Sequence, residues 1–245
     1  MPRQRARLVR TVIVCGFFGL LIYLFWPGSQ ETPAQSAPPA AAAVPPAQSA
    51  PPAAAAAPDF DSPDSTLVVV NKQRPLPADY LPQDLADAGG VLLRAEAAAA
   101  YQLLAAEAGA AGVPITAVSG FRTGAEQEQL YVSYTEDFGP EAADAISARP
   151  GYSEHQTGLA IDIANPDGTC ALESCFSVTL AGSWAAANAH HYGFLIRYPA
   201  GAEHVTGYSH EPWHLRYVGT EHARAVHDAG TTLEEFLGLP AAPGY

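Results

Sequence analysis

A stretch rich in proline, alanine and serine limits the part of this chain that can fold around a core. It runs from residue 27 to residue 64 and contains the sequence QSAPPAAAA twice, starting at Gln35 and Gln48. This composition lacks the large apolar side chains that a core needs, and it favours an extended, disordered, polyproline-like linker. We therefore expect residues 65–245, roughly 180 residues, to form a single folded domain.

A basic segment and an apolar segment precede this linker. Residues 1–10 contain four arginines, and residues 11–26 contain no charged residue. The pattern predicts a basic cytoplasmic tail and a transmembrane helix that acts as a signal anchor. The protein would then be a single-pass protein of the cytoplasmic membrane with its domain on the extracytoplasmic side. A cleaved signal peptide is the alternative, which we disfavour because Phe25 and Trp26 close the run and no A-x-A site follows at once.

Charge and cysteine content narrow the class of protein further. All 25 Asp and Glu residues lie beyond position 30, together with only eight of the 12 Lys and Arg residues. Such an acidic domain argues against nucleic acid as a partner, because phosphates demand a basic surface. Cys170 and Cys175 are close in sequence and would form a disulfide in an exported domain, with two free thiols as the alternative.

Strands and helices are expected to mix without regular alternation. This arrangement predicts an α+β domain with a mainly antiparallel sheet flanked by helices. Strands are predicted at 67–77, where prolines interrupt the strand, and at 113–121, 159–165, 194–199 and 213–219. Helices are predicted at 91–108, after a capping box formed by Thr123 and Glu126, at 183–193, and near the C-terminus after Thr231 and Glu234.

Three separated polar segments, at 119–123, 153–162 and 211–214, contain candidate metal ligands. Catalytic zinc takes three protein ligands from His and carboxylate groups and leaves a fourth position for water. His155, Asp162 and His214 can supply such a set, and we expect them to bind one Zn²⁺ per chain in a cleft. Asp162 lies in the apolar run LAIDI, where a carboxylate is costly unless it is paired or metal-bound. An arginine partner for Asp162 and ordinary hydrogen-bonding roles for the histidines are the alternatives.

The same segments contain candidates for catalysis and substrate binding. Glu211 precedes His214 by three residues and would act as a general base, although it could also be a surface residue or a metal ligand. Arg122 could bind a substrate carboxylate or stabilise a tetrahedral intermediate, or simply form a surface ion pair. Gln127 could bind a substrate amide, and Ser153 could orient His155 or contact the substrate.

These segments resemble the VanY-type family of zinc D-Ala-D-Ala carboxypeptidases. The family pattern S-x-H-x-x-G-x-A-x-D matches residues 153–162, and E-P-W-H matches residues 211–214. VNKQRPLP, SGFR and GFLIRYP also occur in the family order, so the resemblance covers roughly residues 67–239. Phe121 and Thr123 replace the Tyr and Ser that are common there, and both changes are conservative.

The resemblance implies hydrolysis of the terminal D-amino acid from a peptidoglycan stem peptide or precursor. His155, Asp162 and His214 would bind zinc, Glu211 would activate water, and Arg122 would stabilise the oxyanion or bind the substrate carboxylate. An L,D-carboxypeptidase acting on tetrapeptide stems is the first alternative, and an endopeptidase is a further one. A non-catalytic muropeptide-binding module is the alternative from another class, and the presence of Glu211 argues against it.

Overall fold

The computed structural model describes residues 58–245. The predicted cytoplasmic tail, the predicted transmembrane helix and the linker up to residue 57 lie outside the described residues. Within residues 58–245, none of the helices has both the length and the apolar character needed to cross a bilayer. The last linker residues already contact the domain, since Phe60 packs against a cluster containing Val69 and its carbonyl accepts a hydrogen bond from the Val69 N–H over 3.0 Å.

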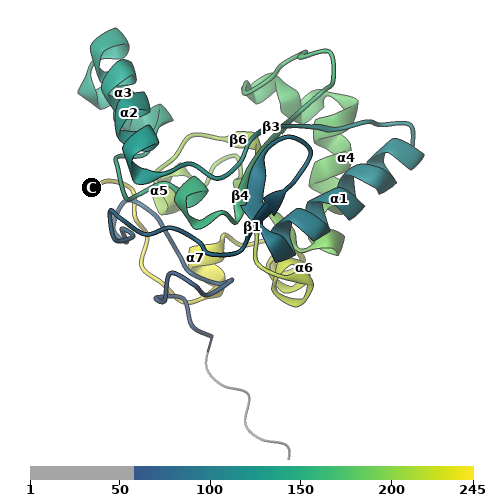
Figure 1. The fold of residues 1–245 in the computed structure, drawn as a ribbon, viewed down its shortest axis with the longest axis horizontal. Helices are drawn as coiled ribbons and strands as arrows, with labels where there is room; N and C mark the ends of the chain where they lie inside the picture. Colours follow the sequence, from purple (N-terminus) through teal and green to yellow (C-terminus); the bar gives the residue numbers. More distant parts are fainter. Residues whose placement is uncertain (1–57) are drawn as a thin grey trace, which may run out of the picture. The chain divides into compact units, whose positions relative to one another are not determined.

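A four-stranded antiparallel sheet forms the centre of the domain (Figure 1), as the sequence predicted. Its strands follow the order β3, β4, β6, β5, and each neighbouring pair is antiparallel. They comprise β3 (Thr116–Ser119), β4 (Ala160–Ala164), β5 (Phe194–Tyr198) and β6 (Glu211–Tyr217). A separate hairpin joins β1 (Leu85–Asp87) to β2 (Leu92–Arg94).

Every residue of the inner strand β4 is buried, which explains its continuous apolar sequence around a single aspartate. Ile161, Ile163 and Leu215 belong to the main core cluster and are completely buried. Helix α1 (Ala95–Ala110) packs Tyr101 and Leu104 into the same cluster. Helix α4 (Leu180–Asn188) contributes small alanines, and a 3-10 turn, η3 (Ala189–Tyr192), follows it.

Two helices form an arm beside the sheet. Helix α2 (Gly124–Phe138) begins with the predicted capping box, in which Thr123 and Glu126 each accept a hydrogen bond from the other's backbone N–H. Helix α3 (Pro140–Ile146) follows directly after Gly139 and packs against α2. Figure 1 shows both helices projecting away from the sheet, at the upper left of the view. Leu130 and Tyr134 of α2 and Ile146 of α3 line a cleft next to the sheet.

Two sequence predictions were wrong in this part of the chain. Residues 67–77 form no strand, because their backbone groups bond to loops and side chains. The Val69 N–H donates to the Phe60 carbonyl, the Val68 carbonyl accepts from the Arg216 side chain, and only an isolated bridge joins Asn71 to Arg74. The predicted helix at 91–108 begins only at Ala95, because residues 92–94 pair with β1. Strand pairing at residues 92–94 thus outweighed their local helix propensity.

Short helices complete the domain. The 3-10 turns are η1 (Glu154–Thr157) and η2 (Ser174–Val178), and the remaining helices are α5 (Glu203–Thr206), α6 (Thr220–Ala229) and α7 (Leu233–Phe236). The capping box of α7 uses Thr232 and Glu235, one residue after the predicted pair. This shift places Glu234 on the inner face of α7, where it is completely buried.

Candidate metal centre

Three separate elements bring the predicted ligands together. His155 lies in η1, Asp162 in β4 and His214 in β6. Asp162 and His214 are directly paired across the antiparallel strands, so their side chains share one face of the sheet. Gly158 ends η1 in the left-handed conformation, with φ of 68°, and so allows the chain to turn from His155 into β4. The seven residues from His155 to Asp162 thus span the rest of η1, the turn at Gly158 and the first half of β4.

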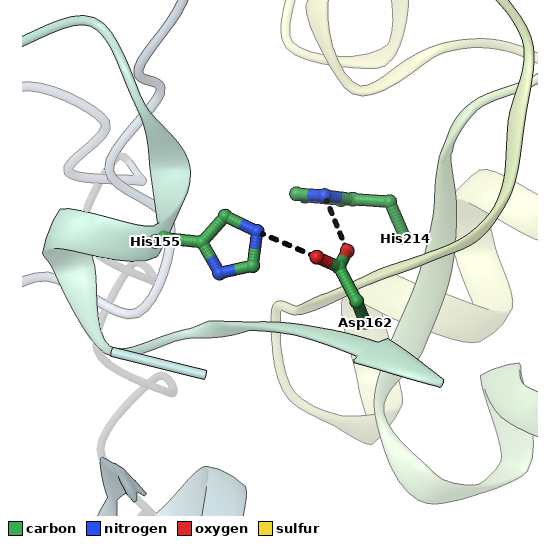
Figure 2. A group of neighbouring side chains, drawn as sticks. All are labelled: His155, Asp162 and His214. Atoms are coloured by element: carbon green, nitrogen blue, oxygen red, sulfur yellow. Dashed lines mark ion pairs between the residues drawn. The ribbon is translucent and has the colours of Figure 1, made fainter. Parts of the chain in front are cut away.

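The three side chains point toward one another in Figure 2. His155 Nε2 lies 3.3 Å from Asp162 Oδ2, and His214 Nδ1 lies 3.2 Å from Asp162 Oδ1. The two imidazole rings are 5.0 Å apart and nearly perpendicular, at 84°. One potential ligand atom from each residue lies within 4.8 Å of the other two, and all three residues are buried. Among the described residues, no other group of His, Cys, Asp or Glu side chains meets this condition.

The chemistry of this donor set fits zinc. Two imidazoles and one carboxylate form a usual catalytic zinc set that leaves a position for water. Asp162 Oδ1 is buried and makes no hydrogen bond to any described residue. Burial would lower the pKa of His214, but Asp162 and Glu154 outweigh it and raise that pKa to about 9. The surrounding carboxylates thus favour positive charge at this position, which a divalent cation would supply.

The outer nitrogen of each ligand histidine faces an acceptor. His155 Nδ1 lies 2.7 Å from the carbonyl oxygen of Gly120, which follows β3. His214 Nε2 lies 3.5 Å from Glu154 Oε2, and neither atom has a hydrogen-bond partner among the described residues. Acceptors in these positions fix which ring nitrogen carries the proton and leave the other free for metal. His155 would therefore ligate through Nε2 and His214 through Nδ1.

Glu154 belongs to a buried ionic network that was not predicted from the sequence. Its Oε1 accepts hydrogen bonds from Arg197 Nε and Arg216 Nη1, both over 2.8 Å. Arg197 donates two further bonds to Glu234, over 2.8 and 2.6 Å. Burial opposes ionisation of Glu154, but the two guanidinium groups outweigh it and hold its pKa well below the usual range. We call Glu154, Arg197, Arg216 and Glu234 the rear network.

The sequence contains only a partial signal for this network. Arg197 and Arg216 lie in strand segments that read as apolar, and Glu154 reads as a loop residue. One available signal was the presence of a single arginine in each of the runs FLIRYP and WHLRYV, since an arginine inside a buried strand requires a carboxylate partner. The partner itself could not be identified, because Glu154 lies 43 residues from Arg197 and 62 from Arg216 along the chain.

Glu211 lies at the start of β6 beside the predicted ligands. Its Oε2 is 3.7 Å from His214 Nδ1, and its side chain is 17% exposed. Burial, followed by the neighbouring charges of Asp162 and Glu154, raises the pKa of Glu211 to about 7 despite His214 and Arg122. A carboxylate with a near-neutral pKa can both accept and donate a proton at physiological pH.

Arg122 lines the same cleft and immediately precedes Thr123, the N-cap residue of α2. Its Nη2 donates to Ser119 Oγ over 3.0 Å, and its Nη1 donates to Gln127 Oε1 over 2.7 Å. Gln127 is only 1% exposed, and its amide nitrogen donates to Ser147 Oγ and to the Ala148 carbonyl. Gln127 thus holds Arg122 in place. A direct contact from Gln127 to a substrate stays a prediction.

Ser153 lines the same cleft and is buried, but the described residues contain no hydrogen bond from its hydroxyl to His155. Gly120 takes the orienting role that the sequence reading gave to Ser153. A contact from Ser153 to substrate stays a prediction.

These residues surround one cleft of about 360 Å³. Its lining includes the three candidate ligands, Glu211 and Arg122, together with the apolar ring of Trp213. A second cavity of about 420 Å³ lies between β5, α4 and α6 and contains no comparable group of ligands. The cleft around His155, Asp162 and His214 is therefore the candidate active site, because it combines possible metal ligands with a carboxylate and a guanidinium.

Comparisons with known proteins agree with this site. A family model described as VanY, D-alanyl-D-alanine carboxypeptidase, matches residues 90–220. A D-alanyl-D-alanine carboxypeptidase of Enterococcus faecalis is 35% identical over 186 residues, which cover 72% of this chain and 67% of the relative.

Solved structures agree as well. The L,D-carboxypeptidase LdcB, whose structure concerns peptidoglycan recognition, is 38% identical with a TM-score of 0.68, covering 72% of this chain and 87% of that one. A VanY D,D-pentapeptidase variant in complex with Zn(II) is 33% identical with a TM-score of 0.61, covering 70% of this chain and 98% of that one. The matched family segment spans more than half of the chain. The chain therefore belongs to the VanY family of D-alanyl-D-alanine carboxypeptidases.

Proposed function

We propose that this protein is a zinc-dependent carboxypeptidase that removes the C-terminal D-amino acid from peptidoglycan stem peptides. The observation that carries the proposal is the presence of a His-Asp-His candidate ligand set, the partly exposed carboxylate of Glu211 and the guanidinium of Arg122 in one cleft. His155, Asp162 and His214 would hold the zinc ion. Bound there, zinc would lower the pKa of a water molecule and polarise the scissile carbonyl.

Glu211 is proposed to move the proton. Its carboxylate faces the same space as the metal-facing nitrogen of His214, so it can take a proton from water in the cleft. The same carboxyl group, once protonated, can deliver that proton to the leaving amine. The pKa of about 7 suits both steps, because neither form of the side chain is strongly favoured at neutral pH.

Arg122 is proposed to recognise the substrate. It is the one Arg or Lys side chain among the residues described as lining this cleft, and two hydrogen bonds hold it in place. A guanidinium can form paired hydrogen bonds with the free carboxylate of a peptide terminus or stabilise the oxyanion of the tetrahedral intermediate. Either contact favours cleavage next to a C-terminus.

The family resemblance leaves two substrate classes in competition. In the first alternative, the D,D-reading, the protein is a D,D-carboxypeptidase that cleaves the terminal D-Ala-D-Ala bond of a pentapeptide stem. The names of the VanY relatives describe D-alanyl-D-alanine carboxypeptidase or D,D-pentapeptidase activity for those proteins. In the second alternative, the L,D-reading, the protein is an L,D-carboxypeptidase that cleaves the terminal residue from a tetrapeptide stem. It gains support from LdcB, which has a higher TM-score and identity than the VanY variant. We keep the D,D-reading first because the matched family carries that description.

Amino-acid release by the purified full-length protein tests both readings. Matched pentapeptide and tetrapeptide stems are incubated with zinc, with a chelator, and with the Glu211→Gln variant. Chelator-sensitive release of D-Ala from the pentapeptide alone supports the D,D-reading, and release from the tetrapeptide alone supports the L,D-reading. Failure of the folded, zinc-loaded protein to cleave either stem contradicts the proposal and favours an endopeptidase or a binding module.

We also propose that the domain acts on the outer side of the cytoplasmic membrane. The apolar run at residues 11–26, the basic residues before it and the linker after it support this placement. A protease added to intact cells should then remove the domain from a membrane-bound stump. Protection of the domain from such a protease would contradict the proposed topology.

A further inference from the structure

The loop between β4 and α4 contributes an unusual residue to the cleft. Leu172 is 45% exposed and lines the same cleft as Arg122, Glu211 and His214. A single exposed leucine is ordinary on a protein surface. A leucine beside a catalytic centre, in an unfavourable backbone conformation, requires an explanation.

The backbone of this loop is strained. Cys170 and Leu172, with φ of 55° and 56°, are the only non-glycine residues with positive φ in the described part of the chain. The Cβ atom of an L-residue crowds the backbone in this region, and glycine or asparagine normally occupies it. Such conformations persist where the surrounding structure enforces them, and they concentrate at functional sites.

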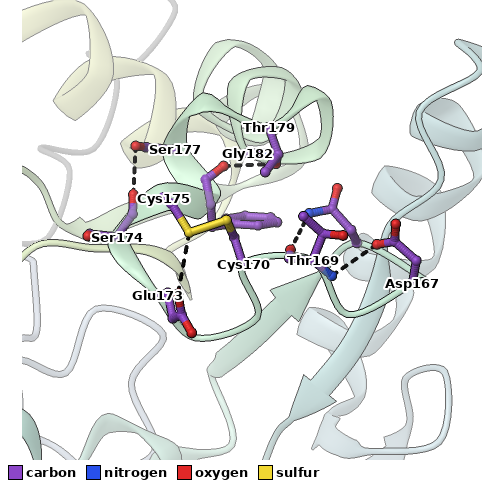
Figure 3. The surroundings of a disulfide bond; sticks show 11 residues. Asp167, Thr169, Cys170, Glu173, Ser174, Cys175, Ser177, Thr179 and Gly182 are labelled. Carbon is purple, nitrogen blue, oxygen red and sulfur yellow. Dashed lines mark hydrogen bonds between the residues drawn. A yellow bond between two sulfur atoms is a disulfide. The ribbon is translucent and has the colours of Figure 1, made fainter.

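A disulfide and the hydrophobic core enforce the conformation. Figure 3 shows the Cys170–Cys175 disulfide, which was predicted from the sequence. Leu172 lies between the two cysteines in the sequence, so the disulfide closes a short loop that contains it. Cys175 lies in η2, beside Phe176, which is completely buried. Gly182 of α4 packs so closely on this segment that a Cβ atom there would meet the Phe176 carbonyl oxygen at 1.9 Å.

The other end of the loop is fixed as well. It leaves β4, the strand that carries Asp162. Two successive turns then follow, in which Ala171 N–H donates to the Gly168 carbonyl over 3.1 Å and Glu173 N–H donates to the Cys170 carbonyl over 3.3 Å. Turns and a disulfide thus restrain the backbone on both sides of Leu172.

Other walls of the cleft are also apolar. The α2–α3 arm contributes Leu130, Tyr134 and Ile146, and β6 contributes Trp213. A peptide whose terminus reaches Arg122 would pass between these walls. Its aliphatic side chains would lose water when they contact them, which favours binding.

We infer that Leu172 is a specificity-determining residue, which the disulfide-closed loop holds against the aliphatic side chains of the bound stem peptide. The inference rests on the proposed function, because it takes a stem peptide as the ligand of this cleft. The strained backbone is thus explained as the means of placing an apolar side chain beside the metal centre.

The variant Leu172→Asn tests this role, because asparagine tolerates positive φ, is close to leucine in size and removes the apolar contact. We expect its thermal stability to equal or exceed that of the wild type. The KM for a stem peptide should rise about three- to tenfold, with kcat and zinc content changed by less than about twofold. Leu180→Asn is the matched control, since Leu180 is 77% exposed and does not line the cleft.

Two further measurements sharpen the test. Replacing the alanines of the stem peptide by serine should raise the KM of the wild type and change that of Leu172→Asn much less. The double variant Cys170→Ser with Cys175→Ser should also raise the KM, because the loop no longer holds Leu172 in position. Equal KM values for wild type and Leu172→Asn would overturn the inference.

Binding separates this inference from the proposed function. The Kd of the stem peptide is measured by calorimetry with the zinc-loaded Glu211→Gln variant, with and without Leu172→Asn. If the wild type cleaves no stem but Leu172→Asn weakens this binding, the inference stands and the proposed function fails. If the wild type cleaves and Leu172→Asn changes neither KM nor Kd, only the inference fails. Absence of both cleavage and binding overturns both.

Discussion

The metal centre has two sides with opposite character. On the rear side, the side chains of Glu154, Arg197 and Arg216 are completely buried, and both arginines donate to Glu154. On the cleft side, Glu211 and Arg122 remain accessible, with Glu211 17% exposed. The rear side is buried and is suited to stabilising the fold and to orienting His214, which Glu154 faces at 3.5 Å. The open side can meet a substrate, and its charges are suited to catalysis and recognition.

The largest expected effect comes from removing one of the three candidate metal ligands, which lie between the rear side and the cleft side. His155→Ala deletes one of three ligands, and we expect zinc to be lost and kcat/KM to fall by about 10⁴-fold or more, because one imidazole and one carboxylate hold zinc poorly. Bound zinc is measured by metal analysis and activity by D-Ala release. His210→Ala is the matched control, because His210 lines the same cleft but lies outside the ligand group. Full zinc occupancy in His155→Ala would contradict the assignment.

Glu211→Gln tests the cleft side alone. The substitution keeps the size of the side chain and removes its ability to accept a proton. We expect kcat to fall by about 10²–10³-fold while zinc content and the KM stay near those of the wild type. Steady-state kinetics and metal analysis on the same preparation give both quantities. A variant that lost its zinc would instead identify Glu211 as a fourth ligand.

Glu154→Gln tests the rear side. It removes the negative charge that faces His214 Nε2 and leaves two arginines without a full counter-charge. We expect zinc affinity to fall by about 10–100-fold and the free energy of unfolding to fall by about 3–5 kcal/mol. Competition with a chelator and denaturant unfolding measure the two effects.

Glu234→Gln is the control that makes this comparison sharp. Glu234 bonds the same arginine, Arg197, but the described contacts include none between Glu234 and the ligand histidines. Its substitution should therefore reduce stability without a comparable loss of zinc affinity. If Glu154→Gln and Glu234→Gln bind zinc equally well, the rear network stabilises the fold but does not orient His214.

Arg122→Lys gives the smallest of these effects. Lysine keeps the positive charge but cannot bond Ser119, Gln127 and a substrate carboxylate in one plane. We expect the KM to rise by about tenfold with zinc affinity unchanged. Kinetics with a stem peptide and with its C-terminal amide provide the measurement. If the rise in KM is the same for both peptides, Arg122 does not bind the carboxylate.

Several parts of this molecule could be predicted because their causes are local. The capping box at Thr123 needs only a threonine and a glutamate three residues apart. The fully buried strand β4 was visible as an apolar run, and the aspartate within that run indicated a ligand or an ion pair. Cys170 and Cys175 are close enough in sequence to be a candidate pair.

Other parts could not be predicted because distant residues decide them. The segment around Val68 has strand propensity, yet the Arg216 side chain takes one of its carbonyls. Residues 92–94 have helical neighbours but pair with β1. The acceptor of His155 Nδ1 is a backbone carbonyl, at Gly120, and no side-chain pattern reveals it.

The sequence by itself determined the ligand types, their order and their spacing, because the motif residues are fixed by the chemistry that zinc and proton transfer require. Only the tertiary structure decided which face of the centre is closed by the rear network and which is open. It also decided that Leu172 meets the cleft. Buried charges are stable only beside their partners, and the partners of Glu154 come from two strands that adjoin only in the folded sheet.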